Sequence, residues 1–319
     1  MLHIALYLRN PRPGLVKTLR QMPQIQLHEA ESAAELIALA PKAQVFVIND
    51  PPAAEGLKIA NALKQPDSAV RWVQILSAGV DGLMQHGVPE GVAITSQGGA
   101  LAAPVAEHAV GLLLGLSRQL FEIGVRTRAG QWNRVFNPSI KAMEGGTVLI
   151  VGLGHIGREV ARRLRAFDMH IIGVSRKGGP DAAADEMAAL SELRSALPRA
   201  DAIVICLALA PETRNLFDAA AFASCKRGAL LVNVSRGEVV DQAALKAALE
   251  SGLLGGAGID VTFPEPLPAG DPLWQAPNLV VSPHTAGAGS ARASQRVSQV
   301  MLDNLERFAR GQALLHKVN

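Results

Sequence analysis

Three polar residues each follow an apolar run that predicts a buried strand, and their types suit anion binding and proton transfer. They are Arg236, Glu265 and His284. The carboxyl ends of parallel strands meet at one edge of a sheet, and open α/β sheets bind their ligands at that edge. The pattern therefore predicts one polar site built from three separate loops.

The three residue types divide the work of a hydride-transfer reaction between them. A guanidinium can hold a substrate carboxylate in a forked geometry, and a histidine can protonate a carbonyl oxygen near pH 7. A carboxylate bonded to that histidine favours its charged form and raises its pKa. Singly, Arg236 could be a surface cation, Glu265 a loop charge among prolines and His284 a structural histidine. Jointly they indicate a catalytic set.

The stretch from Gly145 to Arg176 predicts how a nucleotide is held. An apolar run, Thr147–Val151, leads directly into a GxGxxG sequence, which opens an amphipathic helix and is followed by a second apolar run. Strand, glycine turn, helix and strand in this order are typical of a dinucleotide-binding unit. Gly152 allows the tight turn, Gly154 leaves room for the pyrophosphate, and Gly157 lets the helix pack closely on the strand.

The end of the second strand predicts which nucleotide is preferred. An NAD-binding unit usually carries an acidic residue there, about 20 residues beyond the glycine loop, for the ribose 2′-hydroxyl. This chain has Ser175, Arg176 and Lys177 instead. A hydroxyl and two cations suit a 2′-phosphate, so we expect NADP(H) to be preferred, with NAD(H) as a second cofactor. The alternative is a solvated basic turn.

Size and composition exclude several classes of protein. The 319 residues suffice for two domains, and the scattered net charge of +3 gives no argument for nucleic-acid binding. Cys206 and Cys225 lie far apart without metal-ligand spacing, so we expect no metal site and a reducing, cytoplasmic location. The apolar segment Ala100–Leu116 contains Pro104 and Glu107, which favours a buried helix over a membrane span. The N-terminus lacks the pattern of a signal peptide.

Strands and helices alternate along the whole chain, which predicts an α/β fold with two doubly wound parallel-sheet domains. A flavodoxin-like substrate-binding domain is expected over residues 1–98 and 288–319, with a Rossmann cofactor domain, residues 99–287, inserted into it. A long helix is expected over residues 101–129, and the glycine-containing stretches 97–99 and 286–289 are predicted hinges. The substrate is expected in a cleft between the two domains.

The order and spacing of several short motifs resemble those of the D-isomer-specific 2-hydroxyacid dehydrogenases over essentially the whole chain. The matching stretches are Ser77–Asp81, Val105–His108, Gly152–Gly157, Asn233–Gly237, Gly258–Val261, Pro264–Pro268 and Ser282–Gly287. The resemblance implies that Arg236, Glu265 and His284 are the catalytic residues. It also implies a homodimer built largely on the second domain.

The resemblance implies further binding roles. Asp260 would hold the nicotinamide carboxamide, and main-chain N–H groups around Val80 would bind the substrate carboxylate. The residues expected to bind substrate are Ala78, Gly79, Val80, Arg236 and His284. Those expected to contact the cofactor are Gly152, Gly154, His155, Ile156, Gly157, Ser175, Arg176, Lys177, Leu207, Ala208, Pro211, Val234, Ser235, Arg236, Asp260, His284, Ala286 and Gly287.

The expected activity is NADPH-preferring reduction of small 2-keto acids, such as glyoxylate or hydroxypyruvate, to D-2-hydroxy acids. Two alternatives stay open at this point. One is another dehydrogenase on the same scaffold, acting on formate or phosphite. The other is a non-enzymatic, dinucleotide-sensing protein that binds a partner. Glu107 and His108 are expected to make helix or inter-domain contacts rather than to bind a metal.

Overall fold

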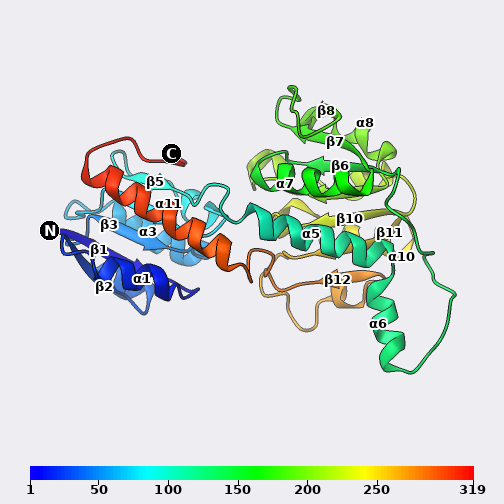
Figure 1. Cartoon of the computed structure of the whole chain (residues 1–319), viewed down its shortest axis with the longest axis horizontal. Helices are drawn as coiled ribbons and strands as arrows, with labels where there is room; N and C mark the ends of the chain where they lie inside the picture. Colours follow the sequence, from blue (N-terminus) through cyan, green and yellow to red (C-terminus); the bar gives the residue numbers. More distant parts are fainter. The chain divides into compact units, whose positions relative to one another are not determined.

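A computed structural model describes every residue from Met1 to Asn319, and the chain divides into two compact α/β units (Figure 1). Unit 1 comprises Met1–Leu101 and Ser290–Asn319, whereas unit 2 is the continuous segment Ala102–Gly289. Unit 1 therefore contains both ends of the chain. No helix in the structure is both long and apolar enough to cross a membrane.

Unit 1 is built on a five-stranded parallel sheet with the strand order β2-β1-β3-β4-β5, which is the flavodoxin-like order. Its strands are β1 (Leu2–Tyr7), β2 (Ile25–Glu29), β3 (Val45–Ile48), β4 (Trp72–Ile75) and β5 (Ala93–Thr95). Its helices are α1 (Pro13–Arg20), α2 (Ala33–Ala38), α3 (Ala53–Leu63), α4 (Asp81–Met84) and α11 (Ala291–Ala309). The N-terminus of α2 is capped by Ser32, whose hydroxyl accepts a hydrogen bond from the N–H of Glu35.

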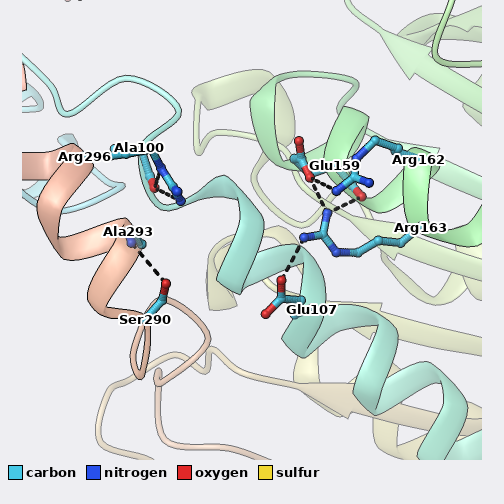
Figure 2. A network of polar contacts seen from close by, with 8 residues as sticks. All are labelled: Ala100, Glu107, Glu159, Arg162, Arg163, Ser290, Ala293 and Arg296. Carbon is cyan, nitrogen blue, oxygen red and sulfur yellow. Dashed lines mark hydrogen bonds and ion pairs between the residues drawn. The ribbon is translucent and has the colours of Figure 1, made fainter.

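Helices cover both faces of the unit 1 sheet because the strands are apolar on both sides. On one face α1 and α11 pack through residues such as Leu19 and Met301, and on the other α3 packs through Ile59. At the start of α11 the hydroxyl of Ser290 accepts a hydrogen bond from the N–H of Ala293 (Figure 2). The C-terminal helix is thus part of the same core as the N-terminal strands.

The residues after α11 also belong to unit 1. Lys317 forms a bridge with Thr95 of β5, and the N–H of Val318 donates to the carbonyl of Ile94 at 2.9 Å. Arg296 of α11 donates two hydrogen bonds, of 3.1 and 2.9 Å, to the carbonyl of Ala100 (Figure 2). The last 30 residues therefore complete one face and one edge of this sheet.

Unit 2 is built on a seven-stranded parallel sheet with the order β12-β11-β10-β9-β6-β7-β8. Its first six strands in chain order follow the Rossmann arrangement, and β12 extends it by one strand. The strands are β6 (Thr147–Val151), β7 (His170–Ser175), β8 (Glu186–Ala189), β9 (Ala202–Ile205), β10 (Ala229–Asn233), β11 (Leu254–Ile259) and β12 (Leu279–Val281).

Helices also cover both faces of the unit 2 sheet. They are α5 (Ala102–Ser117), α6 (Leu120–Arg128), α7 (His155–Leu164), α8 (Leu193–Ala196), α9 (Ala219–Ala223) and α10 (Gln242–Glu250). One face is covered by α5 and α7, through residues such as Leu113 and Val160, and the other by α8, α9 and α10. Asp241 caps α10 by accepting from the N–H groups of Ala243 and Ala244.

The expected single helix over residues 101–129 is wrong. The chain forms two helices, because Gln119 adopts a left-handed backbone conformation with φ of 56° between α5 and α6. A left-handed residue cannot continue a right-handed helix, so the chain changes direction there. Phe121 then folds back so closely that a Cβ on Gly115 would lie 2.4 Å from its ring.

Candidate active site

The carboxyl ends of β10, β11 and β12 hold the three residues expected to do chemistry. Arg236, Glu265 and His284 lie in the loops that follow these strands, and all three belong to unit 2. Two backbone hydrogen bonds tie the loops together: the N–H of Asp260 donates to Asn233, and the N–H of His284 donates to Asp260. The predicted meeting of three loops at one sheet edge is therefore what the structure has.

Glu265 and His284 form a hydrogen-bonded pair. The Nδ1–H of His284 donates to Oε2 of Glu265 over 2.8 Å, and Oε1 of Glu265 accepts from the N–H of Thr262 at 3.0 Å. Both partners remain in contact with solvent, with side-chain exposures of 51% for His284 and 39% for Glu265. The pair fixes the imidazole with Nδ1 occupied, which leaves Nε2 as its second proton-carrying atom.

The hydrogen bond to Glu265 raises the pKa of His284, against the opposing effects of partial burial and of the Arg236 charge. Partial burial pushes the pKa of Glu265 upward, but the bond from His284 and the nearby charges outweigh it and lower that pKa. Because the pKa of His284 is raised, its charged form persists to higher pH and is lost as the pH rises through that value. The pair therefore favours an ionised carboxylate against a protonated imidazole.

Arg236 is held at the start of a tight loop after β10. Its Nη1 donates to the carbonyl of Ser235 at 2.7 Å, and its own carbonyl accepts from the amide of Asn233 at 2.9 Å. The next residue, Gly237, has no space for a side chain, because a Cβ there would lie 2.1 Å from the backbone of Thr262. This close approach brings the Arg236 loop against the Glu265 loop.

Asp260 is the most buried charged residue of the site, with 2% exposure. Oδ1 accepts from the hydroxyl of Ser282 at 2.6 Å and from the N–H of Thr285 at 2.9 Å, and Oδ2 accepts from the N–H of Ala286 at 2.9 Å. A buried carboxylate needs such donors to remain charged. In this structure Asp260 therefore organises the loop that contains His284, Ala286 and Gly287.

The glycine loop after β6 has the geometry that a dinucleotide needs. Gly152 has φ of +102°, and a Cβ there would lie 2.8 Å from the backbone of Cys206. A Cβ on Gly157 would lie 2.2 Å from the carbonyl of Gly152, so helix and strand can pack only with glycine there. At Gly154, by contrast, an added Cβ meets nothing within 4 Å. The loop thus leaves open space in front of the helix.

The N-terminus of α7 opens into that space. Gly154 is its N-cap and no side chain caps the helix, so the first-turn N–H groups, those of His155 and Ile156 among them, face outward. Free N–H groups and the positive end of the helix dipole favour a phosphate. These features fit the pyrophosphate of a nicotinamide dinucleotide.

Ser175 ends β7, and Arg176 and Lys177 follow it as exposed residues. The hydroxyl of Ser175 accepts from the N–H of Gly178 at 3.1 Å, which stabilises the turn. The guanidinium of Arg176 is 81% exposed and lies 3.6 Å from the carboxylate of Glu212. The basic pair is thus accessible at the strand next to β6.

The loop after β9 is also ordered by its own side chains. It contains Leu207, Ala208 and Pro211, and the hydroxyl of Thr213 bonds to the main chain of Ala208 and Ala210. On the β10 side, Val234 and Ser235 are buried, and the N–H and hydroxyl of Ser235 both donate to Oδ1 of Asn233. These loops lie at the same sheet edge as the glycine loop.

The remaining expected site residues, Ala78, Gly79 and Val80, lie in unit 1 between β4 and α4. The hydroxyl of Ser77 orders this loop by donating to the carbonyl of Gly79 and accepting from the N–H of Asp50. Within unit 1, the N–H groups of Gly79 and Val80 donate to no acceptor.

Sequence reasoning did not predict the partners of two residues of α5 that lie near the site. The Nε2–H of His108 donates to the hydroxyl of Ser282 at 2.8 Å, and Glu107 pairs with Arg163 at 2.9 Å. The expectation was that Glu107 and His108 make helix or inter-domain contacts. Glu107 bonds to a residue of α7 and His108 to the loop after β12, and both partners lie in unit 2. Ser282 directly follows β12, so the rule that found His284 could also have found Ser282.

Comparison with known proteins places the chain in a family. Residues 110–286 match the family model of the D-isomer specific 2-hydroxyacid dehydrogenase NAD-binding domain. The chain belongs to the D-isomer specific 2-hydroxyacid dehydrogenases. It is accordingly an NAD(P)-dependent oxidoreductase with a Rossmann cofactor domain.

Relatives match over nearly all of the chain. A glyoxylate reductase of Thermofilum pendens is 32% identical over 322 residues, covering 96% of this chain and 92% of that protein. The solved structure of a family member from Aeromonas salmonicida is 30% identical with a TM-score of 0.84, covering 100% of this chain and 99% of the other. A member from Xanthobacter autotrophicus, solved in complex with NADPH and MES, is 27% identical with a TM-score of 0.80, covering 99% and 98%.

Proposed function

We propose that this protein is an NADPH-preferring reductase that converts small 2-keto acids, of the size of glyoxylate or hydroxypyruvate, into D-2-hydroxy acids. The observation that carries the proposal is the 2.8 Å pair of His284 and Glu265 beside the loop of Arg236. This is a positioned proton donor next to a cation that suits a carboxylate. The similarity to the glyoxylate reductase of Thermofilum pendens supports the same substrate class.

The residues of the site take distinct roles in this proposal. Arg236 binds the substrate carboxylate and orients the carbonyl group, with the N–H groups of Gly79 and Val80 as a proposed second anchor. When bound, the reduced cofactor supplies the hydride that adds to the carbonyl carbon. The carbonyl oxygen gains negative charge as this happens, and protonated His284 donates its Nε2 proton to it. Glu265 stays ionised and keeps the imidazole oriented throughout.

The cofactor preference rests on the residues that follow β7. Ser175, Arg176 and Lys177 provide a hydroxyl and two exposed cations where an NAD-specific site would have an acid. The N-terminus of α7 and the space in front of Gly154 suit the pyrophosphate. The cofactor in the Xanthobacter autotrophicus relative is NADPH, which supports the same choice. We also propose a cytoplasmic location, on the cysteine argument given above.

The proposal is tested by initial rates of NADPH and NADH oxidation, measured side by side with glyoxylate, hydroxypyruvate, pyruvate and the bulkier phenylpyruvate. We expect turnover of the small keto acids with a clear preference for NADPH. Preference for NADH would keep the enzyme class and contradict the 2′-phosphate assignment. Binding of NADPH without turnover of any of the four acids would contradict the proposed reaction.

Replacing both Arg176 and Lys177 with Ala is expected to reduce the ratio of kcat/KM with NADPH to that with NADH by about 10- to 100-fold, since charge-assisted bonds to the 2′-phosphate are lost. The rate with NADH should change little. Arg199→Ala is a matched control, because Arg199 is an exposed arginine of the same unit paired with Glu186. An unchanged cofactor ratio in the double variant would remove these residues from 2′-phosphate binding.

We further propose a homodimer that uses α6 and the segment after it. No residue of α6 is buried, and the exposed apolar side chains there include Val125 at 52% and Trp132 at 90%. An apolar surface of this kind on a water-facing helix marks an interaction site. A second copy of this chain is the occupant that the family resemblance implies.

Leu120→Asp combined with Val125→Asp, at side chains that are 53% and 52% exposed, is expected to shift the protein from dimer to monomer in size-exclusion chromatography with light scattering, because charges would have to be buried in the contact. Leu57→Asp, at an equally exposed apolar position on α3, is the control and should leave the mass unchanged. A wild-type protein that is monomeric at all concentrations would refute the proposed contact.

A further inference from the structure

A chain of three side chains connects α5 to the loop that contains His284. The hydroxyl of Ser282 donates to Oδ1 of Asp260 at 2.6 Å, so its own lone pair accepts the Nε2–H of His108 at 2.8 Å. His108 Nε2 also lies 3.4 Å from Oδ1 of Asp260. In this series of hydrogen bonds each donor has an acceptor: His108 donates to Ser282, and Ser282 donates to the carboxylate of Asp260.

The hydrogen bonds among His108, Ser282 and Asp260 hold the backbone around His284 in place. Asp260 holds the loop from both sides of that residue: its carbonyl accepts the N–H of His284 at 2.8 Å, and its carboxylate accepts the N–H groups of Thr285 and Ala286. His284 itself has φ of +52°, a left-handed conformation that is uncommon for residues other than Gly, although His, Asn and Asp adopt it more often than most. Such a conformation persists only where neighbouring bonds enforce it.

The helix segment around His108, at the other end of this series of hydrogen bonds, is also held in place. Residue 107, next to His108 on α5, pairs with Arg163 of α7, and Arg163 also pairs with Glu159 (Figure 2). Arg162 adds a second bond to Glu159 at 2.9 Å. The helix that opens at the glycine loop and the helix that contains His108 are therefore fixed to each other by ion pairs as well as by their apolar contact.

We propose that His108 is a positioning residue for the reaction: through Ser282 and Asp260 it holds the His284 loop in the conformation that directs the imidazole at Glu265. The inference rests on the proposed function only in taking His284 as the proton donor. His108 touches neither substrate nor cofactor in this role. It acts as a donor that keeps the Ser282 hydroxyl turned towards Asp260.

The test is the titration of His284 followed by NMR of the imidazole groups in the whole protein without ligands. The signal is identified by its loss in His284→Asn, among the eight histidines of the chain. Three charged groups face His284, namely Glu265, Arg236 and Asp260. In His108→Ala we expect the pKa of His284 to fall towards its ordinary value, because the loop no longer holds it against Glu265, and kcat for keto-acid reduction to fall about tenfold.

His108→Gln retains an amide N–H near the position of the imidazole Nε2–H, and we expect it to restore both the titration and kcat to near wild-type values. His170→Ala is the matched control, since His170, the first residue of β7, is half-exposed and bonds to Glu186. If His108→Ala does not fold, Ser282→Ala removes the middle of the chain and is expected to give the same fall in pKa.

An unchanged titration of His284 in a folded His108→Ala variant would overturn the proposal. So would an equal loss of kcat in His108→Ala and His108→Gln with both titrations unchanged, because that pattern indicates a packing role alone. The titration does not depend on turnover. If wild-type protein reduces no keto acid, the proposed function fails, while the positioning role still stands or falls on the NMR result.

Discussion

Replacing His284 with Asn is expected to lower kcat for keto-acid reduction by about 10² to 10⁴, the usual contribution of a positioned general acid. Asn tolerates the left-handed backbone at this position, with φ of +52°, so the loop should keep its shape. The affinity for NADPH should be retained, because the phosphate-binding features lie in other loops. Initial rates and a fluorescence titration of NADPH measure the two quantities.

The pH dependence of the wild-type enzyme also tests whether His284 is the proton donor. The proposed reduction uses protonated His284, so kcat/KM should fall as the pH rises through the raised pKa of His284, and oxidation of the hydroxy acid should show the opposite trend. His170→Asn controls for the loss of a histidine, since its ring bonds to Glu186 far from the reacting groups. Near-wild-type turnover in His284→Asn would remove His284 from the mechanism.

Replacing Arg236 with Ala is expected to lower kcat/KM for keto acids by about 10²-fold, through a higher KM and a lower kcat together. The guanidinium is proposed to hold the carboxylate in both the bound substrate and the transition state, so both constants should respond. Its backbone is extended, with φ of −139° and ψ of 146°, so Ala introduces no strain. Steady-state kinetics over a range of keto-acid concentrations separate the two effects.

Arg236→Lys tests the geometry of the same contact. Lysine retains the charge but lacks the fork, so it should recover part of the affinity and less of kcat. Arg199→Ala, an exposed ion-paired arginine, should have wild-type constants. An unchanged KM for every keto acid in Arg236→Ala would exclude the assigned role and direct attention to the N–H groups of Gly79 and Val80.

Most of the fold could be predicted from alternation of strands and helices, because the strands of a doubly wound sheet are buried on both faces and form continuous apolar runs. β6 and β10 are such runs. β8 could not be found in this way. It is a short edge strand, Glu186–Ala189, with no fully buried residue, and its pairing with β7 becomes visible only in three dimensions.

The break between α5 and α6 was missed for a related reason. Gln119 is neither Gly nor Pro, and its local sequence predicts a continuing helix. What ends α5 is the packing of Phe121 against Gly115, a contact between residues that no helical periodicity would bring together. Tertiary packing overrides local preference at this point.

The residues of the candidate site also include some that the sequence predicts and some that it does not. Arg236, Glu265 and His284 could be predicted because each follows a strand, and the carboxyl ends of parallel strands share an edge. The hydrogen-bond chain of His108, Ser282 and Asp260 could not, because it joins a helix to a loop 174 residues away along the chain. Position after a strand predicts the proposed reacting groups, whereas the residues proposed to orient them become visible only through their contacts.

Unit 1 is formed by residues from both ends of the chain, and this affects how it folds during protein synthesis. Its five strands leave the ribosome first, but α11, which covers one face of their sheet, follows only after residues 102–289. At the usual elongation rate of about 5–20 residues per second, this delay lasts roughly 10 to 40 s. During that time unit 2 can complete its own sheet, while the apolar face formed by residues such as Trp72 and Leu76 lacks the part of its cover that α11 supplies. In the nascent chain, that uncovered face is where a chaperone would have most to bind.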